Sequence, residues 1–384
     1  MADTDQLHQQ MRTWRRHLHA HPEFGFEEAR TAAFVAELLR GFGMDEVVEG
    51  VGGTGIVATL RRGSSGRAIA LRADMDALRI AETGECAHRS TVPGTMHACG
   101  HDGHTAMLLG AARLLAEEGG FDGCVRFIFQ PAEEWGRGAL AMLEDGLLER
   151  FPFTEIYGLH NMPGQALGSF TTRPGAIMSA EDNFEIVLTG LGGHASRPQA
   201  GAEVMVAGAA LVTTLQEIVS RRLDPADTAV VSVTQFVTDG TRNVLPGVAT
   251  ISGDVRSFDP AVSAAVEAYM RRIAQGIAYA HGVAAQVRYT REFVPLVNDP
   301  ACAAEALAVA TGIMGVERVS VAARPITASE DFARFLERVP GCFAFLGNGE
   351  GSPPLHNPGY DFADAILLDG ARFHAGIARR RLPA

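Results

Sequence analysis

The sequence predicts an α/β protein of two domains, in which a small α+β domain interrupts a larger α/β domain. Three observations lead to this fold class. At 384 residues the chain is longer than one hydrophobic core usually supports. Short apolar strands and helical patterns alternate over residues 1–181 and again over 294–384. Between them, residues 182–293 follow the order strand–helix–strand–strand–helix–strand, the ferredoxin-like split motif.

Composition restricts the classes of partner. Hydrophobic residues make up 47% and charged residues 20% of the chain, as in folded proteins, and no apolar run reaches the length of a bilayer. The net charge of −12 argues against a nucleic-acid partner. The first ten residues do not resemble a secretory signal, and five irregularly spaced cysteines suit a reducing compartment. We expect a cytoplasmic protein that binds a small molecule, with neither a nucleic acid nor a membrane as partner.

The chain begins with two predicted helices, over residues 5–19 and 27–39, each with apolar residues at helical spacing. His17, His19 and His21 alternate at the end of the first helix. Such a cluster on its own usually lies on the surface or caps a helix, so we expect no metal there.

Two short apolar runs follow at 55–60 and 68–71, and the turn residues between them predict a hairpin that enters a sheet. The second run leads into Arg72, Asp74 and Asp76. Carboxylates at the end of a strand suit a site, because open α/β sheets place their sites there. They suit a hydrogen-bonded turn equally well.

The stretch Met96–His104, with the sequence MHACGHDGH, carries the strongest chemical signal. Cys99 and His101 are two residues apart, so both can reach one ion from a loop, and thiolate with imidazole suits zinc and its neighbours. The apolar pattern after Gly103 predicts a buried helix that begins at this loop.

The next two predicted strands also end in metal-binding residue types. The strand at 125–129 leads to Glu133 and Glu134, and the strand at 155–159 leads to His160. Adjacent side chains on an extended backbone point in opposite directions. One glutamate is therefore expected to bind a metal while the other addresses a neighbouring water.

The inserted domain is predicted from its own pattern, with linkers near 179–182 and 293–298. Its strands are expected at 184–188, 229–237, 249–255 and 283–289, and its helices at 202–220 and 262–280. Within it, His194 follows two glycines, Asn243 lies in a loop, and Arg256 ends a strand. Each of these three is a weak signal alone.

The first domain resumes with a predicted helix at 300–314, a strand at 342–346 and a last helix at 364–380. Ser329 and Glu330 suit either a helix cap or a site. His356 lies between two prolines and is a fifth candidate ligand.

Taken together, these motifs resemble the M20 metallopeptidase family, in the amidohydrolase branch of hippurate hydrolases, N-acyl-L-amino acid amidohydrolases and auxin-conjugate hydrolases. The resemblance rests on RADMDAL at 72–78, MHACGHDGH at 96–104, QPAEE at 130–134, GLHN at 158–161, GHAS at 193–196, SEDF at 329–332 and LHN at 355–357.

This resemblance implies a zinc-peptidase-like catalytic domain with an inserted lid domain, and hydrolysis of N-acyl or N-aroyl amino acids. It implies one or two divalent ions (zinc, manganese or cobalt) per subunit, and a homo-oligomer, either a dimer or a tetramer, through the lid. Glu133 is the implied catalytic base, and His194 the residue that helps to hold the oxyanion. Asn243 and Arg256 match positions that grip the substrate carboxylate. The implied metal ligands are Cys99, His101, Glu134, His160 and His356.

Two positions depart from the pattern. Arg72 stands where the wider family has a histidine ligand, which leaves the role of Asp74 open, and Arg79 stands where the branch often has proline. Three alternatives also stay open: a metallo-dipeptidase or carboxypeptidase of the same fold, a cysteine hydrolase that uses Cys99, and a non-catalytic binding protein that zinc stabilises. The last would leave Glu133 with no structural task, because structural zinc sites are closed by four ligands.

Overall fold

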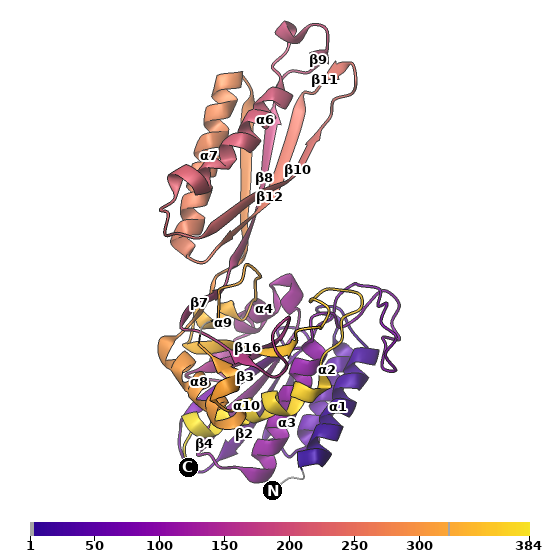
Figure 1. The fold of residues 1–384 in the computed structure, drawn as a ribbon, viewed down its shortest axis with the longest axis vertical. Helices are drawn as coiled ribbons and strands as arrows, with labels where there is room; N and C mark the ends of the chain where they lie inside the picture. The colour runs from indigo at the N-terminus through magenta and orange to yellow at the C-terminus, as the bar shows by residue number, and fades with distance from the viewer. Residues whose placement is uncertain (1–3, 322) are drawn as a thin grey trace. The chain divides into compact units, whose positions relative to one another are not determined.

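The computed structural model describes residues 4–321 and 323–384 and divides the chain into two compact units (Figure 1). The first unit is discontinuous, and the second interrupts it, at boundaries near those expected at 181/182 and 293/294. The first unit comprises Met1–Ile177, Val297–Arg324 and Glu330–Ala384, and the second comprises Met178–Leu296 and Pro325–Ser329. The chain passes from one to the other through strands β7 (Gly175–Met178) and β14 (Leu296–Asn298), which pair with each other.

The first unit is built on a mixed eight-stranded sheet. In sheet order its strands are β1 (Glu46–Val51), β2 (Gly55–Arg62), β4 (Gly123–Gln130), β3 (Ala68–Asp74), β5 (Ile156–Pro163), β16 (Gly341–Gly349), β6 (Phe170–Thr171) and β15 (Val319–Ser320). The neighbouring strands β4, β3, β5 and β16 run parallel to one another. Their carboxyl ends therefore lie along one edge of the sheet, the edge where open α/β sheets carry their sites.

The hairpin predicted from residues 55–60 and 68–71 is wrong. β2 and β3 do not pair, because β4 lies between them and pairs with β2 in antiparallel and with β3 in parallel orientation. β2 instead forms its hairpin with β1, which the sequence analysis did not predict. Every residue of β4 is buried, which is typical of a strand covered on both faces.

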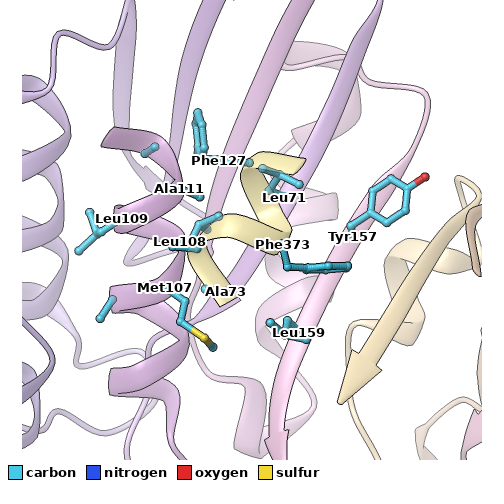
Figure 2. Packing of buried hydrophobic residues seen from close by; sticks show 14 of the residues in the cluster. Leu71, Ala73, Met107, Leu108, Leu109, Ala111, Phe127, Tyr157, Leu159 and Phe373 are labelled. Carbon is cyan, nitrogen blue, oxygen red and sulfur yellow. The ribbon is translucent and has the colours of Figure 1, made fainter. Parts of the chain in front are cut away.

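Helices cover this sheet. They are α1 (Thr4–Ala20), α2 (Ala29–Gly41), α3 (His101–Glu118), α4 (Gly138–Glu144), α5 (Leu147–Arg150), α8 (Pro300–Met314), α9 (Ala333–Leu336) and α10 (Leu367–Arg381). Figure 2 shows how Met107 and Leu108 of α3 lie against Leu71 of β3 and Phe373 of α10. α3 packs against both α1 and α10, so its apolar sequence is buried almost all round. This burial fixes its first turn, where His101 stands, against the sheet.

The second unit has the element order expected from the sequence, β-α-β-β-α-β. Its antiparallel sheet has the order β10 (Ala229–Thr238), β12 (Val248–Ser257), β8 (Ala180–Thr189), β13 (Ala284–Phe293), and its helices are α6 (Val204–Leu215) and α7 (Pro260–His281). Alternate residues of β8 are buried, so one face packs against the helices (Figure 1). The helix predicted over 202–220 ends at Leu215, and a π-helical turn follows.

A separate two-stranded sheet is also part of this unit. It pairs β9 (Gly193–His194) with β11 (Val244–Leu245), which are far apart in the sequence. Within residues 4–321 and 323–384, no helix is both long and apolar enough to span a bilayer.

Candidate metal centre and catalytic residues

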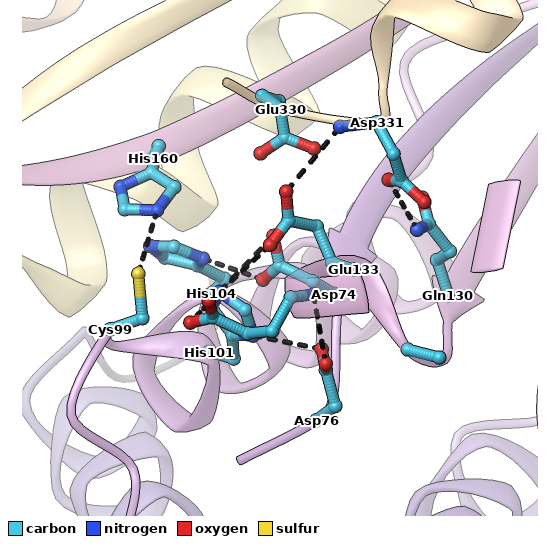
Figure 3. Close-up of polar contacts among 12 residues, drawn as sticks. Asp74, Asp76, Cys99, His101, His104, Gln130, Glu133, His160, Glu330 and Asp331 are labelled. Carbon is cyan, nitrogen blue, oxygen red and sulfur yellow. Dashed lines mark hydrogen bonds and ion pairs between the residues drawn. The ribbon is translucent and has the colours of Figure 1, made fainter. Parts of the chain in front are cut away.

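Four segments of the first unit bring metal-binding side chains to the carboxyl edge of the sheet, and Figure 3 shows Cys99, His101, Glu133 and His160 from three of them. β5 carries His160, and α3 begins with His101 directly after Cys99. Gly100 connects these two residues with a φ of 98°, a conformation that glycine adopts without strain. Glu133 and Glu134 follow β4 in a short 3-10 turn, and His356 lies in the loop after β16.

The five predicted ligands meet in this one place. Ligand atoms of Cys99, His101 and His160 all lie within 4.8 Å of one another, and so do those of Cys99, Glu134 and His356. The Cys99 sulfur lies 3.5 Å from Nε2 of His160. Nε2 of His356 lies 3.3 Å from Oε1 of Glu134. Ligands of a tetrahedral zinc are roughly 3.3–3.8 Å apart, given metal–ligand bonds of about 2.0–2.3 Å.

The buried polar atoms at this place suit a cation. His101 Nε2 is buried and has no hydrogen-bond partner among the described residues. Burial raises the pKa of the Cys99 thiol, and the carboxylates of Glu134 and Glu133 raise it further. Such a thiol ionises when a cation balances the charge. Sulfur, nitrogen and oxygen donors together fit a divalent transition metal.

Neighbouring groups hydrogen-bond to the proposed ligands on the side that faces away from the centre. Oδ1 of Asp76 lies 3.0 Å from Nδ1 of His101, which leaves Nε2 facing the centre. Oδ2 of Asp76 accepts a hydrogen bond from the backbone N–H of Glu134. Nδ1 of His160 lies 2.6 Å from the backbone oxygen of Asn161. These contacts fix which ring nitrogen is available, as is usual for histidine ligands.

His104 also lies in this cluster but has both ring nitrogens occupied. Its Nδ1 is 2.6 Å from Oδ1 of Asp74, and its Nε2 accepts the backbone N–H of Asn161 at 2.9 Å. Asp74, His101 and His104 lie close enough together to hold an ion. His104 is not available as a ligand, however, because both of its ring nitrogens are already hydrogen-bonded. Asp74 and His104 therefore support the centre without binding an ion themselves.

Glu133 stands beside the ligands without belonging to either ligand group. Its Oε2 is 3.9 Å from Nε2 of His101, and its Oε1 is 3.4 Å from the backbone N–H of Asp331. Burial raises the pKa of Glu133 well above its usual range, and Glu330, Glu134 and Asp331 raise it further. A carboxylate with a raised pKa is a better proton acceptor near neutral pH. The preceding Ala132 has a φ of 46°, and its N–H is held by Glu28.

Arg72 lies fully buried behind this glutamate. It donates to Asp74 at 2.7 Å, to Glu330 at 2.9 Å and to Gln130 at 2.8 Å. Gln130 in turn donates to Asp331 (Figure 3). Arg72, the residue that departs from the family pattern, therefore balances the charge of a group of buried carboxylates.

A family model described as peptidase family M20/M25/M40 matches residues 70–380 of the chain. The chain belongs to the M20 family. It is 39% identical over 368 residues to a hippurate hydrolase of Campylobacter jejuni, and the alignment covers 96% of this chain and 95% of the hydrolase. It is 42% identical over 296 residues to an N-acyl-L-amino acid amidohydrolase of Geobacillus stearothermophilus, covering 77% and 79%. The crystal structure of the Bacillus subtilis YXEP protein, described as a dinuclear metal-binding M20 peptidase, matches with a TM-score of 0.88 at 33% identity, covering 99% of both chains.

Sequence reasoning left Asp76 open between a site and a turn, and it missed the contacts of His104 and Asn161. All three contact the proposed ligands or each other, but only their place beside the ligand motifs distinguished them from turn residues. The two glutamates are not on extended backbone as expected, because they form a 3-10 turn. The turn nevertheless gives Glu133 and Glu134 different neighbours. Ser329 does not cap a helix; its hydroxyl accepts a hydrogen bond from Arg256.

The predicted lid residues of this M20 chain all lie in the second unit. His194 and Asn243 are neighbours at the small β9–β11 sheet, where the backbone oxygen of Asn243 accepts the N–H of Ala195. His194 is exposed, and its Nδ1 accepts the Ser196 backbone N–H. Arg256 lies near the carboxyl end of β12, where it pairs with Glu181 and Asp254 at 2.8 Å each. Arg256 therefore lies in a different sheet from the pair His194 and Asn243.

Proposed function

We propose that this chain is a metal-dependent amidohydrolase that cleaves N-acyl or N-aroyl amino acids to a carboxylic acid and a free amino acid. The observation that carries the proposal is a buried glutamate beside a complete set of metal ligands. Glu133 is held by the N–H of Asp331 and lies next to His101, yet Glu134 is the glutamate grouped with Cys99 and His356. A purely structural metal site has no use for such a base.

We assign Cys99, His101, Glu134, His160 and His356 as ligands of one or two divalent ions, with zinc, manganese and cobalt as the candidates. Two ligand groups that share Cys99 support a pair of ions. A bound divalent ion supplies Lewis acidity, which lowers the pKa of a bound water and polarises a carbonyl.

Glu133 accepts the proton of the attacking water and delivers it to the leaving nitrogen. Proton transfer of this kind contributes roughly 10²–10⁴ in rate. The amide nitrogen leaves poorly as an anion, so its protonation by Glu133 is needed before the bond breaks. The N–H of Asp331 holds the carboxylate in place, and the raised pKa favours the proton on Glu133 between the two transfers.

We further propose that His194 holds the developing oxyanion and that Arg256 and Asn243 bind the carboxylate of the amino acid. Arg256 lies near one end of β12, and His194 and Asn243 lie beyond its other end, which begins eight residues away, about 26 Å on an extended strand. One small substrate cannot contact residues this far apart in the same unit. We therefore propose that His194 and Asn243 reach the substrate together from a second copy of the chain, in a homo-oligomer formed through this unit. The cytoplasmic location expected from the sequence is retained as part of the proposal.

The decisive experiment compares benzoylglycine, N-acetyl amino acids and simple dipeptides after reconstitution with zinc, manganese or cobalt. We expect the N-acyl amino acids to be cleaved and a chelator to abolish the activity. Faster cleavage of dipeptides would favour the dipeptidase or carboxypeptidase alternative, and activity that survives chelation would remove the metal from the reaction.

Two adjacent substitutions separate the roles of the glutamates. Glu133→Gln should keep its metal content while kcat falls by about 10²–10⁴. Glu134→Gln should lose metal content as well as activity. Equal metal loss in both variants would contradict the assignment of Glu133 as the base.

Arg256→Ala should raise KM for N-acyl amino acids and have little effect on amides that lack a carboxylate. Arg271→Ala, on α7 of the same unit, is the matched control. Equal effects of Arg256→Ala on both substrate classes would exclude carboxylate recognition by this residue.

A further inference from the structure

A second cluster of metal-binding side chains lies in the first unit and shares no residue with the candidate catalytic centre. Two groups of ligand atoms, each within 4.8 Å of one another, meet at one cysteine. The first group is His19, Glu82 and Cys86, and the second is Cys86, His88 and Asp361. Cys86 is thus positioned between two pairs of imidazole and carboxylate.

The ligand atoms of each group lie close enough together to surround one ion, and the two groups share only Cys86. Oε1 of Glu82 lies 3.6 Å from the Cys86 sulfur and 3.3 Å from Nε2 of His19. Oδ2 of Asp361 lies 3.0 Å from Nε2 of His88. Tetrahedral ligands of zinc are roughly 3.3–3.8 Å apart, so the pair of His88 and Asp361 would separate slightly around an ion. The same pairs would also suit a simple ion-pair network, so the unpaired atoms decide between the two.

One ring nitrogen within the cluster lacks a partner that a simple network would provide. The side chain of His88 is 9% exposed, and its buried Nδ1 has no hydrogen-bond partner among the described residues. His97, whose ring lies 6.3 Å from that of His19, also has two unpaired ring nitrogens but belongs to neither of the two groups. Buried polar groups are normally hydrogen-bonded, so the network around His88 is incomplete without a further partner.

The charges around the cluster permit a cation. Arg15 lies 2.7 Å from Oδ1 of Asp361, which would repel an ion. The guanidinium is shared with Asp364 at 2.7 Å and Asp102 at 3.6 Å, however, and Oδ2 of Asp361 contacts His88 at 3.0 Å. Together with Glu82 there are four carboxylates, against Arg15, Arg16 on Asp364 and His19 between Glu82 and Asp102.

We propose that Cys86, His88 and Asp361 form a second site that binds one divalent transition-metal ion of the zinc class. One thiolate, one imidazole and one carboxylate make three protein ligands, and Glu82, in contact with Cys86, offers a further carboxylate on the other side of the sulfur. His19 supports the site through Glu82 while its Nδ1 stays bonded to Asp102.

The site joins segments that are distant in the sequence. Glu82, Cys86 and His88 lie in the irregular segment between β3 and α3, and Asp361 lies in the loop that also carries His356. The N–H of Thr83 already bonds the oxygen of Pro358 between these two loops. An ion bound here would hold the His356 loop in place without taking part in hydrolysis.

The first test uses cobalt as a spectroscopic probe in full-length protein that lacks the catalytic thiolate. Cys99→Ala loaded with Co²⁺ should keep a thiolate-to-cobalt charge-transfer band, because Cys86 remains. Cys99→Ala with Cys86→Ser should lose the band. Cys99→Ala with Glu85→Gln is the matched control, since Glu85 is exposed in the same segment, and it should keep the band. The absence of a band in Cys99→Ala, or its persistence without Cys86, would overturn the proposal.

The second test does not require substitution of Cys99. After loading with zinc and dialysis, Cys86→Ser and His88→Asn should each contain one zinc per chain fewer than Glu85→Gln, by elemental analysis. Zinc should also raise the melting temperature of Glu85→Gln more than that of Cys86→Ser. Equal zinc content in all variants would overturn the second site. Because no substrate is used, these readouts are independent of the proposed amidohydrolase activity.

Discussion

Asp76 and His101 are joined by a contact of 3.0 Å between Oδ1 and Nδ1, and the other carboxylate oxygen of Asp76 holds the backbone N–H of Glu134. One carboxylate thus contacts two proposed ligands from different segments. If these residues bind a metal, we expect Asp76 to influence the affinity without itself facing the centre.

We predict that Asp76→Ala weakens metal binding by about 10–100-fold, the usual effect of removing a group that orients a histidine ligand. Asp45→Ala is the control, because Asp45 accepts a backbone N–H from Arg61 at an exposed site. Titration calorimetry with zinc or manganese measures both. Equal affinities for the two variants would show that Asp76 does not orient the ligands.

Gly100 and Gly94 offer a matched test of the metal loop. Both have positive φ, 98° and 77°, so alanine at either position costs about 1–2 kcal/mol in backbone strain. A Cβ at Gly100 would also lie 2.2 Å from Nδ2 of Asn161, whereas a Cβ at Gly94 meets nothing within 4 Å. Gly100→Ala should therefore lower the melting temperature more than Gly94→Ala, and it alone should weaken metal binding. Equal effects would mean that the loop tolerates the displacement.

Arg72 is predicted to be essential for the stability of the first unit. Arg72→Met leaves Asp74, Glu330 and Asp331 buried without their counter-charge, and breaking such a group costs about 3–5 kcal/mol. Arg30→Ala removes an exposed pair with Glu23 and should cost about 0–1 kcal/mol.

Tryptophan fluorescence during denaturation can measure this difference for the first unit alone. Both tryptophans of the chain, Trp14 and Trp135, belong to that unit. A loss for Arg72→Met no larger than that for Arg30→Ala would contradict the role of Arg72 as a counter-charge.

Glu28 should make stability depend on pH. It accepts hydrogen bonds from the Ala132 N–H and the Thr54 hydroxyl, and burial raises its pKa from 4.5 to about 7. Because the folded state holds the proton more tightly, the stabilisation is fully present below pH 4.5 and is lost as the pH rises through 7.

Glu28→Gln cannot ionise and should become more stable than the native chain as the pH rises from 4.5 to above 7, by roughly 3 kcal/mol at most. Denaturation at several pH values measures the difference. Glu37→Gln, exposed on the same helix, should follow the native chain throughout. A constant difference between Glu28→Gln and the native chain would refute the ionisation of Glu28.

The meeting of the proposed ligands in one place could be predicted from the sequence because each of them lies beside a local pattern. Cys99 and His101 precede a buried helix, and His160 follows an apolar run. Parallel strands bring such positions to one edge of a sheet, so strand ends are informative even when the strand order is unknown.

Pairing between distant strands could not be predicted in the same way. The false hairpin arose because nothing in residues 55–71 indicates that β4 inserts between its two halves. Likewise, His19 was expected at the surface, yet it is fully buried against Asp102. Its partner lies 83 residues away, beyond the range of helical periodicity. Local patterns determine elements, whereas non-local contacts determine which polar residues are buried.

The discontinuity of the first unit has a consequence for how the protein is made on the ribosome. Its sheet lacks β16 and its helical layer lacks α10 until the last segment, Glu330–Ala384, has been synthesised. At about 5–20 residues per second, the segment ending at Ile177 waits roughly 10–40 s for its missing neighbours. Most of the second unit is one continuous segment that leaves the ribosome during this interval. During this time the nascent chain exposes an unpaired apolar strand edge at β5. This edge is where a chaperone that binds unfolded chains would act.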